Sequence, residues 1–206
     1  MHVLQSLAPV TASLTGYLSN ATGATWTLTT TTAGDGMAHL TTIKNDTATD
    51  ESLKYSTITG TDCDGYVQTE VLYLPAGSAT VTGLKYFLTI STIVPSASIA
   101  GTMDLGWAAD AYSPTIMLNW RQQDFQVSLG LVITGTISVT VQHTFDRLSI
   151  IGNMQSANWF NHSSLATTAA TADGNYAFPA VATHLKLISV TNGATVKFYV
   201  TQGQQS

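Results

Sequence analysis

The chain has 206 residues, of which 12 are acidic and 7 are basic, so its formal net charge is −5. Its two arginines and five lysines are scattered, and without a basic cluster we expect no counterion-release binding to nucleic acid. The single cysteine, Cys63, excludes an internal disulfide framework and a thiolate-rich zinc site, and we expect a small thiol in a turn or in the core.

The composition favours strands over helices. The chain contains 34 threonines but only 19 charged residues (12 acidic plus 7 basic), and β-branched residues between small polar spacers suit pleated strands. We therefore expect an all-β fold of two antiparallel β-sandwich or barrel-like domains in tandem, since this length allows two cores. No run approaches the roughly 18 apolar residues of a membrane span, and no cationic start precedes an apolar run, so we expect a protein without a membrane partner.

Residues 1–23 are expected to form an N-terminal arm or lead-in strand, and residues 24–106 an N-terminal β-domain. This domain is predicted to begin with two short strands, at 25–32 and 37–43. A hairpin follows over 53–74, turning at Asp64-Gly65. A two-residue turn there would place Ile58 opposite Val71 and leave apolar residues on both faces, so we expect a neighbouring element to cover the face away from the core.

A further strand pair is predicted over 80–93 and 98–105, with Pro95 interrupting its ladder. The alternation then breaks between Gly106 and Pro114. This break is the expected boundary, with a C-terminal β-sandwich domain over 107–206.

From Phe125 to Phe145 apolar and polar residues alternate almost without interruption, as in a half-buried antiparallel sheet. A three-residue connection over 134–136 would pair Ile133 with Ile137 and keep one face apolar. A single long strand with a bulge near Gly135 preserves the same parity, so both arrangements remain open.

The remaining residues form shorter patterns. An Ala/Thr run over 166–172 fits either a short helix or a strand on a packed face. Strands are predicted at 176–178, 184–190 and 195–201, the last two joined by a hairpin turn at Asn192-Gly193.

Motifs for catalysis and metal binding are missing. Asp62-Cys63-Asp64-Gly65 begins like a calcium loop, but the twelfth position is Tyr73 where a bidentate Glu is needed. The five histidines lack the spacings that converge on a metal, and His143, on the apolar face of the long run, is expected to be a hydrogen-bonded core residue. Asp104, Asp110 and Asp124 near the boundary leave paired-carboxylate chemistry open. We expect no enzyme, no cofactor and no metal site.

Large aromatic side chains are the best candidates for contact with a partner, although core filling is their ordinary role. The adjacent pair Trp159-Phe160 is the strongest exception, because two neighbouring bulky rings in a loop do not easily enter one core. The candidate interface residues are Trp107, Tyr112, Trp120, Trp159, Phe160 and Tyr176.

Two groups of turn-and-strand phrases resemble β-modules of tailed-bacteriophage virion proteins. The first is Asp35-Gly36-Met37-Ala38-His39, Asn45-Asp46, residues 59–65 with Gln68-Thr69-Glu70, and Lys85-Tyr86-Phe87. The second is residues 139–146, Trp159-Phe160-Asn161-His162 and residues 173–179.

The resemblance implies a capsid decoration, or cement, protein, made in the host cytoplasm and placed on the outer capsid surface. Its implied partners are the major capsid protein and further copies of itself in a homotrimer, with no catalytic residues. The alternative is a tail, fibre, receptor-binding or carbohydrate-binding virion protein that uses loop aromatics, and a hydrolase is a third option.

Overall fold

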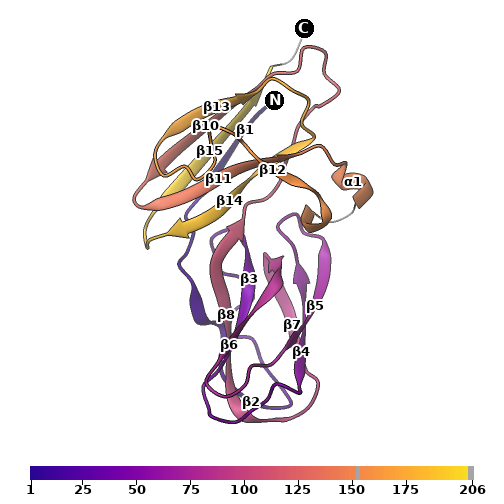
Figure 1. Cartoon of the computed structure of the whole chain (residues 1–206), viewed down its shortest axis with the longest axis vertical. Coiled ribbons are helices and arrows are strands. Elements are labelled where there is room, and N and C mark those ends of the chain that lie inside the picture. The colour runs from indigo at the N-terminus through magenta and orange to yellow at the C-terminus, as the bar shows by residue number, and fades with distance from the viewer. Residues whose placement is uncertain (152–153, 204–206) are drawn as a thin grey trace. The chain divides into compact units, whose positions relative to one another are not determined.

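The computed structural model describes residues 1–151 and 154–203 and contains two compact units, each described by itself (Figure 1). Unit 1 comprises Met1–Thr11 and Tyr112–Ser206, and unit 2 comprises Ala12–Ala111. Apart from α1 (Leu148–Ile151) and a 3-10 turn at Met154–Ser156, the regular structure of the described residues is β-strand, so the predicted all-β class is confirmed.

Unit 1 consists of two antiparallel sheets. One has the strand order β1-β15-β10-β13; in the other, β11 lies between β12 and β14, and β9 pairs with β14. The strands are β1 (His2–Leu7), β9 (Ile116–Met117), β10 (Val127–Thr134), β11 (Ile137–Thr144), β12 (Trp159–Asn161), β13 (Ala172–Tyr176), β14 (Ala182–Val190) and β15 (Thr195–Gln202).

The alternating run of residues 125–145 forms an arch between the two sheets, and is neither a hairpin nor a single strand with a bulge. β10 pairs with β13 and β15, whereas β11 pairs with β12 and β14. The connection turns at Gly135, which has a φ of 80°. The inward row on both strands is buried, as the parity predicted: Val127, Leu129, Leu131, Ile137, Val139 and Val141. An arch and a three-residue hairpin keep the same parity, so the sequence pattern did not distinguish them.

The predicted hairpin at Asn192-Gly193 is also an arch. β14 lies in the sheet of β11, and β15 lies in the sheet of β10. The two arches are stacked on one another. The backbone N–H of Thr191 donates to the carbonyl of Thr136. A Cβ atom added to Gly135 would lie only 3.0 Å from the Cα of Ala194. Their backbones therefore meet at a position where only glycine fits without displacement.

Unit 2 also has two antiparallel sheets, with strand orders β2-β8-β3-β6 and β5-β4-β7. The strands are β2 (Ser13–Gly23), β3 (Ala38–Asn45), β4 (Tyr55–Thr61), β5 (Val67–Tyr73), β6 (Thr80–Phe87), β7 (Thr89–Pro95) and β8 (Ile99–Tyr112). Their shared core includes Tyr17, Ile43, Ile58, Phe87 and Leu105.

Three predictions for unit 2 differ from the structure. Residues 25–32 form a loop, because the N–H groups of Thr29 and Thr30 bond to the carbonyl of Tyr17 and join no ladder. The pattern over 80–93 contains two strands, and β7 pairs with β4 and not with β8. Residues 1–23 hold two strands, of which β1 pairs with β15 in unit 1 and β2 with β8 in unit 2.

The predicted hairpin over 53–74 is present as β4 and β5, but its register is shifted by one residue. Ile58 faces Glu70 and not Val71, because residues 62–66 form a five-residue connection. Asp62 organises this connection: its carboxylate accepts the N–H groups of Asp64 and Tyr66. Cys63 is buried in the same turn, as expected.

In the C-terminal half of the chain, two short assignments also change. The Ala/Thr run over 166–172 is neither a helix nor a full strand: Thr168 makes an isolated bridge to Val139, and Ala172 begins β13. The strand predicted at 176–178 lies earlier, as β13.

Candidate interaction surfaces

Strand β5 turns most of its apolar side chains outward, while a glutamine and a glutamate lie on its inward row with Leu72. Val67, Val71 and Tyr73 are 78%, 55% and 63% exposed, whereas Gln68 and Glu70 between them are 6% and 8% exposed. A strand at the surface of a lone domain normally shows the opposite pattern. The outward row of β5 therefore has the composition of a surface that is covered.

The inward polar residues of β5 are used by the neighbouring backbone. One carboxylate oxygen of Glu70 accepts the N–H of Leu84 at 2.6 Å and that of Lys85 at 3.3 Å. The amide of Gln68 donates to the carbonyl of Tyr86 at 2.5 Å. These bonds satisfy the backbone of β6 where it pairs irregularly with β3. They fix the orientation of β5, so its apolar row must face outward.

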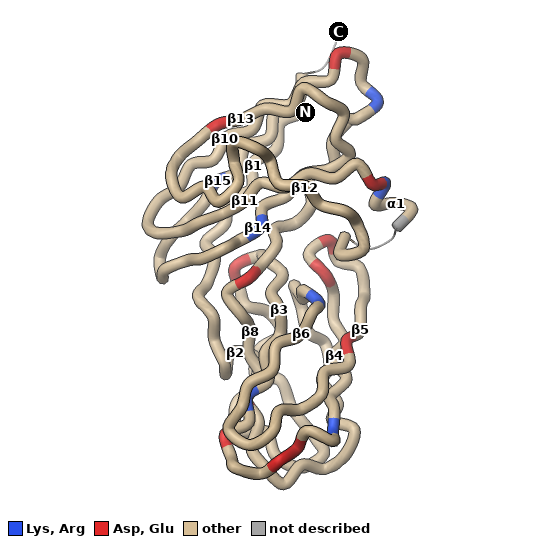
Figure 2. The backbone as a smooth tube through the Cα atoms, in the orientation of Figure 1, with Lys and Arg blue, Asp and Glu red and all other residues tan. Residues whose placement is uncertain are grey.

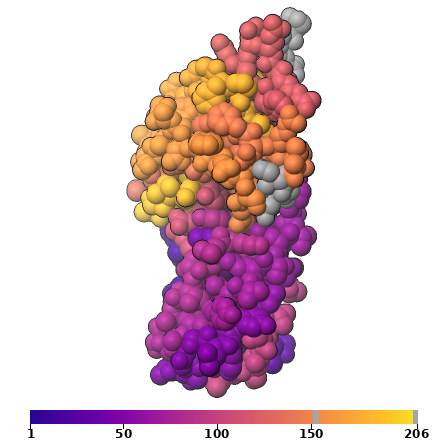
Figure 3. Space-filling view, turned by 45° about the vertical axis from the view of Figure 1, so that its right-hand side comes forward, coloured from indigo at the N-terminus to yellow at the C-terminus, as the bar shows by residue number. Residues whose placement is uncertain are grey.

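The outward row continues across the sheet. Tyr55 of β4 lies opposite Tyr73 of β5, with ring centroids 5.9 Å apart. On the other side of β4, Val94 of β7 lies opposite Thr57 and is 56% exposed. We call this the outer sheet face: Tyr55, Thr57, Thr59, Val67, Thr69, Val71, Tyr73, Thr92 and Val94. It contains no charged side chain, and Figure 2 shows how sparse charged positions are along the backbone. Figure 3 shows unit 2 in a space-filling view, mostly in purple and magenta.

Unit 1 carries a second apolar surface, made of three phenylalanines. Phe145, Phe160 and Phe178 are 50%, 49% and 40% exposed, and the ring of Phe145 lies 5.6 Å from that of Phe160 and 5.7 Å from that of Phe178. They follow β11, lie within β12 and follow β13, respectively. We call these three rings the aromatic patch.

The aromatic patch rests on a buried histidine. The ring centroid of His143 lies between 5.0 and 5.9 Å from those of the three phenylalanines and 5.0 Å from that of Tyr176. His143 is buried, as predicted, but its Nδ1 has no hydrogen-bond partner among the described residues. Burial, helped by the nearby His162, lowers the pKa of His143, so the neutral ring is favoured.

Beside this cluster, Trp159 stacks on a second buried histidine, His184, with centroids 3.8 Å apart. His184 shares a 3.0 Å hydrogen bond between its Nε2 and the side-chain oxygen of Gln142, which fits the neutral ring donating from that nitrogen. Burial, with a smaller effect of Lys186, lowers the pKa of His184 to about 3. Tyr112 also packs against the His184 ring, with centroids 4.9 Å apart, and its own ring lies under the amine of Lys186.

Four of the six predicted interface residues thus come together in unit 1: Tyr112, Trp159, Phe160 and Tyr176. Their roles differ, because Phe160 is half exposed whereas Tyr176 has no exposed surface. The hydroxyl of Tyr176 shares a hydrogen bond with the hydroxyl of Thr183. In this conformation Tyr176 supports the patch from below and offers no contact area of its own.

The other two candidates lie apart from this cluster. Trp107 packs edge-on against Tyr17 inside unit 2. Trp120 lies between the guanidinium groups of Arg121 and Arg147, each within 5 Å of its ring. Neither residue joins the outer sheet face or the aromatic patch.

Sequence reasoning missed Phe145, Phe178 and the whole outer sheet face. Phe145 closes the alternating run, whose parity predicts that it lies in the core with the rest of its row. The signal for β5 was present in Val67-Gln68-Thr69-Glu70-Val71, where two polar residues occupy one parity and two valines the other. Which parity faces the core depended on the register of the turn.

The described residues contain no group of three or more His, Cys, Asp or Glu side chains placed to hold a metal ion. Within residues 1–151 and 154–203, no helix is long and apolar enough to cross a membrane.

Comparison with known proteins gave no relatives: no family model, no curated protein and no solved structure matches the chain.

Proposed function

We propose that the chain is a non-enzymatic structural protein of a tailed-phage virion, which binds the outer surface of the capsid and stabilises contacts between major capsid protein subunits. The outer sheet face is its docking surface, and the protein acts as a homotrimer. The observation that carries the proposal is the inverted pattern of β5, with Glu70 held inside and Val71 held outside.

The energetics of this face support a docking role. Full burial of one large apolar side chain contributes roughly 1.5–3 kcal/mol, so covering Val67, Val71 and Tyr73 would provide several kcal/mol before the costs of association. The threonines between them carry no charge, so a partner covers them without burying an unpaired ion. A protein that binds only the assembled shell adds its binding free energy to the stability of that shell.

Two further observations agree with this role. The phrases around residues 35–87 and 139–179 resemble phage virion modules, as described above. The aromatic patch offers unit 1 a separate apolar contact, which suits a protein that touches more than one subunit.

The test uses empty shells of the particle that carries the chain, stripped of this protein. The wild-type protein should saturate a fixed number of sites per shell and raise the temperature at which the shell breaks. Val71→Lys should weaken binding at least 100-fold, because it places a charge in the centre of the covered face. The matched control is Leu84→Lys, since Leu84 is 86% exposed on β6 and lies outside the face.

Equal binding by wild type and Val71→Lys would exclude the outer sheet face as the docking surface. Failure of the wild-type protein to bind any shell would exclude the decoration role itself.

The alternative role is carbohydrate or receptor binding by a tail or fibre protein, and the half-exposed rings of Phe160 and Phe178 favour it. A glycan array read by tryptophan fluorescence separates the two roles. Saturable binding that Phe160→Ser abolishes would support the alternative, whereas an unresponsive array would leave the docking proposal as the better account.

A further inference from the structure

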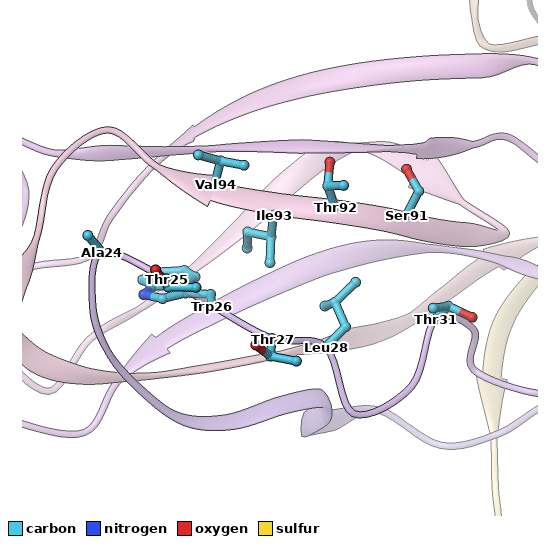
Figure 4. A pocket seen from close by; sticks show the side chains of 10 residues that line it. All are labelled: Ala24, Thr25, Trp26, Thr27, Leu28, Thr31, Ser91, Thr92, Ile93 and Val94. Atoms are coloured by element: carbon cyan, nitrogen blue, oxygen red, sulfur yellow. The ribbon is translucent and has the colours of Figure 1, made fainter.

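Unit 2 contains a groove beside the outer sheet face, with which it shares only the β7 residues Thr92 and Val94. It lies between the loop after β2 and strand β7, and its volume is about 590 Å³ (Figure 4). In Figure 4, Leu28 from the loop and Ile93 from β7 point toward one another, with Trp26 beside them. All ten lining residues are uncharged: five carry hydroxyl groups and the rest are apolar or, in Trp26, aromatic.

One wall of the groove is an unpaired strand edge. β7 is the last strand of its sheet, with β4 on one side only. Ser96 donates its N–H to the carbonyl of Tyr55, and in an antiparallel ladder the bonded pairs alternate along the strands. Val94 and Thr92 therefore bond to β4, whereas the N–H and C=O of Ile93 point away from it. Ile93 thus offers one donor and one acceptor toward the groove.

The other wall begins like a partner strand and then departs from β7. The N–H of Ile90 donates to the carbonyl of Thr31 at 2.7 Å, which closes one end of the groove. Next along the loop, the backbone N–H groups of Thr30 and Thr29 donate to the carbonyl of Tyr17 in β2, and the hydroxyl of Thr30 donates to the carbonyl of Gly16. The loop is therefore held away from β7 beyond this end, and residues 91–94 of β7 line the space left beside the strand.

The groove also contains an unsatisfied donor. Trp26 is 7% exposed, and its indole N–H has no hydrogen-bond partner among the described residues. A buried donor without an acceptor costs about 1–3 kcal/mol. The nitrogen itself is buried, so a carbonyl group of a bound segment would reach it and remove this cost only with a small movement of the ring.

We propose that this groove binds an extended, uncharged segment of a partner protein, which adds to β7 as a further strand. The segment pairs its backbone with Ile93 and places alternate side chains against Trp26 and Leu28. An uncharged segment is required because the lining offers no counterion for a buried charge. A peptide fits better than a sugar, since the lining has no carboxylate, amide or guanidinium group and the unpaired backbone of Ile93 matches another backbone.

The test uses the isolated full chain, so it is independent of capsid binding. The probes are hexapeptides of Ser, Thr, Ala, Val and Tyr with acetylated and amidated ends, which carry polyethylene glycol tags for solubility. Their binding is followed through the amide NMR signals of the protein. We expect saturable shifts of the Ile93 amide and the Trp26 indole N–H. Protection of the Ile93 amide from exchange should rise at least tenfold, while that of Thr92, already bonded to β4, should not change.

Two controls distinguish strand addition from other binding. Peptides N-methylated at alternate residues should lose the effect, because they lack the donors that a ladder needs. Thr92→Lys should also abolish it, because lysine on an edge opposes strand pairing, whereas Thr69→Lys on β5 should leave it intact. Equal binding of N-methylated peptides, no protection at Ile93 with any probe, or shifts produced only by neutral oligosaccharides would each overturn the proposal.

Discussion

The hairpin β4–β5 in unit 2 and the two arches in unit 1 start from similar alternating sequences and use them in opposite ways. In the arches, β10 and β11 belong to different sheets and both turn their apolar rows into one core. In the hairpin, the two strands are neighbours, and Val71 and Tyr73 of β5 remain outside. An alternating pattern therefore fixes which residues share a face, but neither the sheet they join nor the face that is buried.

This difference separates stability from binding in the two units. In unit 1 the exposed rings of the aromatic patch pack against the buried ring of His143, which in turn packs against Tyr176. Substitutions in the aromatic patch therefore also affect the core. In unit 2 the outer sheet face lies mainly on the regular ladder of β4 and β5, and its apolar side chains contact solvent. Substitutions on that face should alter binding far more than folding.

The largest effect on folding is expected from Glu70→Ala. The change removes the acceptor of two backbone N–H groups, those of Leu84 and Lys85, and should lower the free energy of unfolding of unit 2 by about 3 kcal/mol. Val71→Ala, one residue along, should change it by no more than about 0.5 kcal/mol. Urea unfolding followed by amide exchange in β4 and β5 measures both; a larger loss for Val71→Ala would contradict the inverted orientation of β5.

Acidification should distinguish the cores of the two units. The pKa of His184 is about 3 in the folded state and near 6.5 in the unfolded state. Above pH 6.5 the ring is neutral in both states and stability does not depend on pH. As the pH falls from 6.5 toward 3, the unfolded state binds a proton that the folded state does not, so the free energy of unfolding decreases. Between pH 7 and pH 5 unit 1 should lose about 2 kcal/mol. His143, whose pKa is also lowered, acts in the same direction.

In unit 2 the carboxyl groups oppose one another. Burial raises the pKa values of Asp62 and Asp104, which favours the fold at low pH, whereas the hydrogen bond from Lys44 lowers that of Asp46. Thermal unfolding at several pH values, with His184→Gln as the control for unit 1, checks the contrast. An unchanged pH dependence in that variant would show that His184 is not responsible.

The smallest effects concern the stacked arches. Gly135→Ala should destabilise unit 1 by about 2 kcal/mol, because φ is positive and the new Cβ would meet the backbone of Ala194. Gly193→Ala has a similar φ but free space around it, and should cost about 1 kcal/mol. Thermal unfolding of the two variants compares them directly, and equal losses would argue against contact between the arches.

The positions of the strands could be predicted from the sequence better than the pairing between strands. The alternation from Val127 to Val141 was sufficient to predict two strands and the row of side chains that they bury. The Asp64-Gly65 dipeptide was sufficient to predict a hairpin. The partners could not be predicted, because an arch and a short hairpin preserve the same parity. The loop around Trp26 was read as a strand since its alternation is real, but its backbone bonds to Tyr17 instead.

The candidate surfaces were predicted only in part. Phe160 was identified because its neighbour Trp159 is also large, and the two rings indeed point to different surroundings. The outer sheet face required the exact register of a five-residue turn, since a shift by one residue exchanges the inner and outer rows of β5.

Cryo-electron microscopy of the particle that carries the chain would locate the protein on the shell or on the tail. We expect density for this protein on the outer shell, with Val67, Val71 and Tyr73 against a major capsid protein subunit. Density confined to the tail, or an outer sheet face turned toward solvent on the assembled particle, would contradict this expectation.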